Sequence, residues 1–147
     1  MLKQRLLKLL CMLFLFMLAG LPGWSQAAEN WTSKQLIEPA ALAKMITDKR
    51  DVPVIISVGP GAPIPGSVNV GMVNNAEGIG KLKKELAGVS KQAGIVIYCG
   101  CCPFEHCPNV RPAIDMLKQM QFTGYQLLNI PNNIKKDWID KGYPTTN

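Results

Sequence analysis

The chain has 147 residues, a length that suits one compact domain with its own hydrophobic core. Its formal net charge is +6, from 16 basic and 10 acidic residues, and the only dense basic group beyond the first ten positions is Lys81, Lys83 and Lys84. Because the basic residues are not interleaved with aromatic side chains that stack on bases, the composition argues against a nucleic-acid-binding protein.

Residues 1–28 have the pattern of a secretory signal peptide: a basic start, an apolar run from Leu9 to Leu18, and small residues at Ser25 and Ala27. We expect cleavage after Ala27 or after Ala28. The apolar run is shorter than the roughly 20 residues of a membrane-spanning helix. The sequence therefore predicts a periplasmic or secreted protein that is held at the membrane only if this segment stays uncut. The remaining chain would carry a net charge of +3.

Beyond residue 28, short apolar runs alternate with helical patterns. The expected strands are Leu36–Ile37, Val52–Val58, Val68–Val70, Ile95–Tyr98 and Tyr125–Leu128. The expected helices begin at Pro39, run over Ile79–Leu86 with the three lysines on their solvated face, run over Pro112–Met120, and run over Ile134–Lys141. Strands that alternate with helices predict an α/β domain over residues 29–147, with a parallel sheet covered by helices on both faces.

A loop rich in cysteine follows the expected strand Ile95–Tyr98. It contains Cys99, Cys101, Cys102, His106 and Cys107, and His106 is the only histidine of the chain. Open α/β sheets bind ligands at the carboxyl ends of their strands, beside helix N-termini. In an exported protein an even number of cysteines usually forms structural disulfides, but bridges within one short loop constrain the unfolded chain weakly. We therefore expect a chemical role in redox, metal or sulfur chemistry.

Cys99 is the candidate nucleophile of this loop. A cysteine reacts as the thiolate, which positive surroundings favour. Cys99 is expected at a strand end, facing the N-terminal amides of the next helix, and Arg111 near the start of that helix would add a full charge. Inward-pointing N–H groups of such a loop would also stabilise a persulfide anion.

Four motifs along the chain have a characteristic order. Tyr98-Cys99 joins a strand end to a cysteine, and Arg111 lies at the start of the following helix. The other motifs are Ile37-Glu38-Pro39-Ala40-Ala41-Leu42, Ile64-Pro65-Gly66-Ser67 and Trp138-Ile139-Asp140-Lys141-Gly142-Tyr143-Pro144. In this order they resemble the single-domain rhodaneses, a sulfurtransferase family. The resemblance implies a rhodanese-like fold, an open parallel sheet with helices on both faces, whose active-site loop is here atypically rich in cysteine.

The resemblance also implies a reaction. Cys99 would accept sulfane sulfur as a persulfide from a small donor such as thiosulfate, and Arg111 would stabilise the anion. The sulfur would pass to a thiol acceptor, either a small molecule or a protein. Cys101 or Cys102 would be able to attack the persulfide, releasing sulfide and leaving a disulfide. This chemistry requires no cofactor.

The chain departs from the family pattern in two places. The family's Asp-x-Arg pair after the first long strand is replaced by Ser57 and Gly59. Arg111 lies twelve residues after Cys99, seven more than in the usual active-site loop. The additional residues bring in Cys101, Cys102, His106 and Cys107, so the tight anion cradle of the family is not expected unchanged.

Other functions fit the same loop. Cys99 and Cys102 form a CxxC pair after a strand, which is typical of thiol-disulfide redox chemistry. Cys99, Cys101, Cys102, His106 and Cys107 together would supply soft ligands for Zn or Cu(I), although their spacing differs from paired zinc knuckles. The loop would also suit a catalytically silent interaction domain locked by disulfides such as Cys102 to Cys107. The alternative to sulfur transfer is thus a metal-binding or redox module on the same scaffold.

Overall fold

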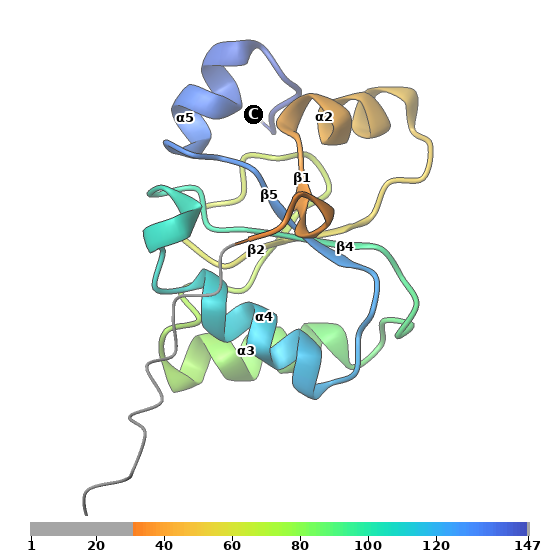
Figure 1. Cartoon of the computed structure of the whole chain (residues 1–147), viewed down its shortest axis with the longest axis vertical. Helices are drawn as coiled ribbons and strands as arrows, with labels where there is room; N and C mark the ends of the chain where they lie inside the picture. Colours follow the sequence, from red (N-terminus) through yellow and green to blue (C-terminus); the bar gives the residue numbers. More distant parts are fainter. Residues whose placement is uncertain (1–30, 147) are drawn as a thin grey trace, which may run out of the picture. The chain divides into compact units, whose positions relative to one another are not determined.

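The computed structural model describes residues 31–146, so the predicted signal peptide over residues 1–28 lies outside the described part of the chain (Figure 1). Five strands form one sheet in which every neighbouring pair is parallel, in the order β1-β5-β4-β2-β3. The strands are β1 (Leu36–Ile37), β2 (Val54–Ser57), β3 (Val68–Asn69), β4 (Ile95–Tyr98) and β5 (Tyr125–Leu128). Within residues 31–146, no helix is both long and apolar enough to span a bilayer.

Helices cover both faces of this sheet (Figure 1). They are α2 (Pro39–Asp48) and α5 (Ile134–Asp137) on one face, and α3 (Ala76–Leu86) and α4 (Val110–Gln119) on the other. Three short 3-10 helices complete the described chain: η1 (Ser33–Gln35), η2 (Phe104–His106) and η3 (Ile139–Lys141). The predicted α/β class, an open parallel sheet with helices on both faces, is confirmed.

Strand β4 lies in the middle of the sheet and contributes to both hydrophobic layers. Ile95 and Ile97 pack with α3 and α4, whereas Val96 and Tyr98 pack with α2 and Trp138. This division follows from the alternation of side chains along a strand. Cys99, the next residue, continues the alternation and enters the α3 and α4 layer.

Some element boundaries differ from the expected ones. Helix α3 begins at Ala76 rather than Ile79, because the Asn75 side chain accepts a hydrogen bond from the backbone N–H of Gly78 and caps the first turn. Helix α4 begins at Val110, two residues before Pro112. A proline is tolerated in the first helical turn because the N–H groups there have no partner within the helix, so its missing N–H costs no hydrogen bond. The lysines on α3 are exposed as expected, and Lys81 pairs with Glu77 at 2.7 Å.

Candidate functional site

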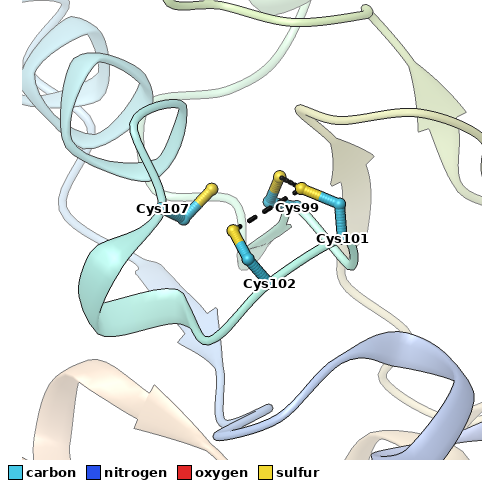
Figure 2. Close-up of side chains that lie close together, drawn as sticks. All are labelled: Cys99, Cys101, Cys102 and Cys107. Atoms are coloured by element: carbon cyan, nitrogen blue, oxygen red, sulfur yellow. Dashed lines mark hydrogen bonds between the residues drawn. The ribbon is translucent and has the colours of Figure 1, made fainter.

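Four cysteine side chains converge at the carboxyl end of β4 (Figure 2). The Sγ atoms of Cys99, Cys101, Cys102 and Cys107 all lie within 4.8 Å of one another. The Cys99 and Cys101 sulfurs are 3.2 Å apart, and those of Cys101 and Cys102 are 3.5 Å apart. A disulfide bond is about 2.05 Å long, so these are four free thiols in contact. We refer to these four residues as the thiol cluster.

The loop that carries the thiol cluster is folded back on itself by two local features. Gly100 has φ +85°, a left-handed conformation that lets the chain reverse directly after Cys99. Phe104 is buried in the core on the α3 and α4 side and anchors the middle of the loop. The backbone N–H of Cys107 then donates to the Phe104 carbonyl at 3.3 Å, which brings Cys107 back toward the strand end.

Burial divides the thiol cluster into an inner and an outer pair. Cys99 and Cys107 are buried, whereas Cys102 is half-buried and Cys101 is exposed. Cys99 directly follows β4 and Cys107 directly follows η2, and the outer pair lies on the loop between them (Figure 2). A reagent from solvent therefore meets Cys101 first.

Gly59 makes room for Cys99. The backbone N–H of Val58 donates to the Tyr98 carbonyl at 2.8 Å, which places Gly59 directly beside Cys99. A Cβ on Gly59 would lie 2.7 Å from the Cys99 sulfur and even closer to its carbonyl oxygen, a distance that real Cβ atoms do not show. Only glycine fits here without moving Cys99. In the sequence Gly59 is visible only as a departure from the Asp-x-Arg pattern, and no sequence motif indicates its packing role.

Asn109, which is not among the site residues predicted from the sequence, directs its amide at the inner pair. Its side-chain oxygen accepts a hydrogen bond from the backbone N–H of Asn74 at 3.1 Å, which fixes the orientation of the buried amide. The Nδ2 group then faces two sulfurs, 3.6 Å from Cys99 and 4.0 Å from Cys107. Asn109 occupies the N-cap position of α4 without capping it, because its side chain is used for these contacts. An asparagine just before a helix was the signal available in the sequence, but it reads as an ordinary cap.

The two thiols of the inner pair differ in pKa. The neighbouring thiol of Cys107, together with burial, raises the pKa of Cys99. The Cys99 thiol, with the backbone N–H groups of Asn109 and Val110 at the start of α4, lowers the pKa of Cys107 to about 5 despite its burial. Burial and its neighbouring thiols raise the pKa of Cys102 to about 12. Of the inner pair, Cys107 is therefore the thiol that ionises more readily.

The other predicted site residues lie outside the thiol cluster. The Arg111 guanidinium lies over the Trp31 ring, 5.7 Å from its centroid. His106 is exposed and is not among the four converging side chains. Ser57 is buried and donates a hydrogen bond to the Gly61 carbonyl at 2.6 Å. The catalytic role expected for Arg111 stays a prediction, as does that of Cys99.

Comparisons with known proteins do not identify the chemistry of the site. No protein-family model matches the chain, and no curated protein matches it. Among solved structures, it is similar to SseA from Escherichia coli, described as having the "rhodanese" fold and catalytic mechanism of 3-mercaptopyruvate sulfotransferases. The two are 17% identical with a TM-score of 0.49, and the match covers 68% of this chain and 41% of that one. The chain thus spans less than half of that protein, and the chemistry of the site rests on the four thiols and Asn109.

Proposed function

We propose that this chain is an exported sulfane-sulfur carrier whose thiol cluster loads and releases one sulfur atom through a persulfide at Cys99. The observation that carries the proposal is the convergence of four free thiols within 4.8 Å at the carboxyl end of β4. The resemblance of Tyr98-Cys99 and its flanking motifs to single-domain rhodaneses adds the identity of the sulfur-loading cysteine.

The loading step begins at Cys99. Its thiol loses its proton to solvent, and the Cys99 sulfur, as the thiolate, attacks the outer sulfur of thiosulfate. A new S–S bond forms, the bond between the two sulfurs of thiosulfate breaks, and sulfite leaves with the electron pair. The product is a Cys99 persulfide anion. Thiosulfate is the probe of this step, and any donor of sulfane sulfur of similar size would react in the same way.

Two donors of the site support the persulfide anion. The Asn109 amide faces the Cys99 sulfur at 3.6 Å, and the start of α4 carries the partial positive charge of a helix N-terminus. The resemblance adds Arg111 as a third source of positive charge, at the second position of α4. N–H donors aimed at a buried sulfur stabilise an anion there more than they would in water.

The release step has two routes. A thiol acceptor from solution takes the outer sulfur and restores the Cys99 thiol. Alternatively, Cys101, whose sulfur lies 3.2 Å from that of Cys99, attacks the inner sulfur of the persulfide. That attack forms a disulfide between Cys99 and Cys101 and expels hydrosulfide, with the Cys101 proton leaving on it. Cys102 lies 3.5 Å from Cys101 and would receive this disulfide by exchange.

The experiment is the intact mass of the reduced, metal-free protein before and after incubation with thiosulfate, and again after cyanide. We expect a gain of one sulfur atom that cyanide removes. No lysine or arginine lies between Lys91 and Arg111, so one tryptic peptide carries all four cysteines and peptide mapping does not separate them. Single Cys→Ser variants are therefore required. Cys99→Ser is expected to abolish the gain, and Cys101→Ser to retain it while prolonging the life of the persulfide.

His106→Gln is the matched control, because His106 is exposed and lies on the same loop outside the thiol cluster. A sulfur gain that persists in Cys99→Ser but not in Cys107→Ser would move the persulfide to Cys107. Wild-type protein that shows only the hydrogen loss of disulfide formation would make the scaffold a redox module instead.

Export is a separate part of the proposal. The signal pattern predicts that protein recovered from the periplasm or medium begins at Ala28 or Glu29. The intact mass of the secreted fraction tests this directly. A mass that includes residues 1–28, found only in membranes, would instead indicate an uncut anchor.

A further inference from the structure

The thiol cluster has a property that single-sulfur transfer does not need. One nucleophile and one resolving thiol suffice for the proposed reaction, yet four sulfurs from a nine-residue segment point toward one centre (Figure 2). Bringing two further thiols into that space costs backbone conformational freedom. The arrangement therefore calls for a ligand that all four sulfurs contact at once.

The separations of the sulfurs match a tetrahedral metal site. Zinc binds thiolate sulfur at about 2.3 Å, so the corners of a Zn(Cys)₄ tetrahedron are about 3.8 Å apart. The sulfurs here are 3.2 Å apart between Cys99 and Cys101 and 3.5 Å apart between Cys101 and Cys102, and no pair exceeds 4.8 Å. The edge of the tetrahedron, about 3.8 Å, lies within this range of separations.

The surroundings of the cluster suit the charge of such a site. Four thiolates around Zn²⁺ leave a net charge of −2, which needs N–H donors close to the sulfurs. The Asn109 amide faces Cys99 and Cys107, and the backbone N–H groups of Asn109 and Val110 face Cys107 at the start of α4. The amide is itself held by the Asn74 backbone, so the donors are in place before a metal binds.

We propose that the thiol cluster is a zinc site in which Cys99, Cys101, Cys102 and Cys107 bind one Zn²⁺ as four thiolates. Four soft sulfur ligands within 4.8 Å of one another favour zinc over oxygen-seeking ions such as Mg²⁺ or Ca²⁺. The site is closed, since all four positions are filled by protein. In the zinc-bound state no thiol of the cluster is free to attack a sulfur donor, so zinc switches sulfur loading off, a consequence that rests on the proposed function.

The first test needs no substitution. Protein purified under reducing conditions without a chelator is expected to hold one Zn²⁺ per chain, and metal-free protein to bind one Co²⁺ with the visible absorption of a tetrahedral thiolate complex. Removing the metal is expected to expose four more thiols per chain to a thiol reagent. Binding of Cu(I) without Zn²⁺, or loss of the zinc when a weak chelator is added to the purified protein, would overturn the assignment.

The second test assigns the ligands. Each of Cys99→Ser, Cys101→Ser, Cys102→Ser and Cys107→Ser is expected to lose zinc retention, whereas His106→Gln is expected to keep it. Thermal unfolding of each variant in the metal-free state shows whether it folds. A folded cysteine variant that binds Zn²⁺ as tightly as the wild type would contradict the four-ligand site, and loss of zinc in His106→Gln would replace one thiolate by the imidazole.

The third test separates this inference from the proposed function. Metal-free protein and protein with one equivalent of Zn²⁺ are each treated with thiosulfate, and the intact mass of each sample is measured. A sulfur gain only in the metal-free sample supports both proposals. Zinc retention with no sulfur gain in either sample overturns sulfur transfer and leaves the zinc site standing. An equal sulfur gain in both samples shows that Cys99 is not bound to the metal.

Discussion

The two faces of the sheet differ sharply at the carboxyl end of β4. On one face Tyr98 is fully buried, and its hydroxyl lies 3.0 Å from the Ser67 hydroxyl. On the other face Cys99 enters a cluster of thiols whose partners are other sulfurs and one amide. Consecutive residues of one strand thus supply an ordinary hydrophobic layer and a reactive site. The parallel pairing of β2 with β4 fixes the positions of Tyr98 and Cys99 at the end of the strand. We therefore expect that a substitution in one layer leaves the other layer intact.

The layer on the Tyr98 face is stabilised by packing in the usual way. Trp138 is fully buried there, its Nε1 donates to the Pro144 carbonyl at 2.8 Å, and its ring meets Tyr143 edge to face at 5.3 Å. The thiol cluster has weaker contacts, since sulfur is a poor hydrogen-bond partner. We infer that the Tyr98 face supplies stability, and that the Cys99 face is held in a shape suited to a ligand.

The largest expected effect is that of Trp138→Ala, which tests whether the Tyr98 face carries the stability. Removing a fully buried tryptophan should lower the free energy of unfolding by about 3–5 kcal/mol. Chemical denaturation measures this change. Zinc content per folded molecule should stay at the wild-type value, because the substitution lies in the other layer. Trp138→Phe, which keeps most of the packing, should cost less, and a loss of zinc in folded Trp138→Ala would show that the two faces are coupled.

The fold could be predicted from the sequence because its main elements are strongly patterned. The β-branched run Ile95–Tyr98 and the helix that follows it leave little choice of local structure, and their alternation with β2 and β5 leads to a parallel sheet. Boundaries were less predictable where a single side chain decides them. The Asn75 cap, for example, starts α3 three residues before the first apolar position of its pattern.

The second prediction changes the Cys99 face at the backbone. Gly59→Ala places a Cβ against the Cys99 sulfur and carbonyl, so Cys99 must move. We expect a loss of about 1–3 kcal/mol in the free energy of unfolding, as for an overpacked core, with loss of sulfur loading and zinc retention. Gly80→Ala is the matched control: nothing lies within 4 Å of its added Cβ in the exposed middle of α3. There the same change should raise stability by up to about 1 kcal/mol. Equal effects of both substitutions would contradict the packing role of Gly59.

The third prediction concerns the amide that faces the sulfurs. Asn109→Asp keeps the oxygen that accepts from Asn74 but replaces the Nδ2 donor by a second anionic oxygen next to Cys99 and Cys107. The affinity for Zn²⁺ should fall by roughly 10- to 100-fold, as is typical when a partner of a metal ligand is lost. Competition with a chelator of known affinity measures this. Asn75→Asp, where the side chain only accepts from Gly78 at the α3 cap, should leave the affinity unchanged. An unchanged affinity in Asn109→Asp would reduce Asn109 to a packing role.

The thiol cluster itself was only partly predictable. The four cysteines were recognisable by residue type, and the strand before them gave their place at the sheet edge. Their convergence depends on the Gly100 turn and on the burial of Phe104, which act over distances that no periodic pattern records. His106 is grouped with the cysteines only by residue type and sequence position, and its exposed side chain lies at the end of η2.

The smallest expected effect is that of Arg111→Gln, in the first turn of α4. Removing the guanidinium from the Trp31 ring should lower the free energy of unfolding by about 0.5–1 kcal/mol, the usual contribution of such a cation–π contact. If the arginine also stabilises the anion, as the family resemblance implies, Arg111→Gln should load sulfur from the dianion thiosulfate more slowly than the wild type does at low salt. This difference in rate should shrink as added salt screens the charge. Arg50→Gln removes the same charge from the turn after α2 and should leave loading unchanged. A loading rate in Arg111→Gln equal to that of wild type at low salt would restrict Arg111 to packing on Trp31, and anion stabilisation would then fall to Asn109 and the start of α4.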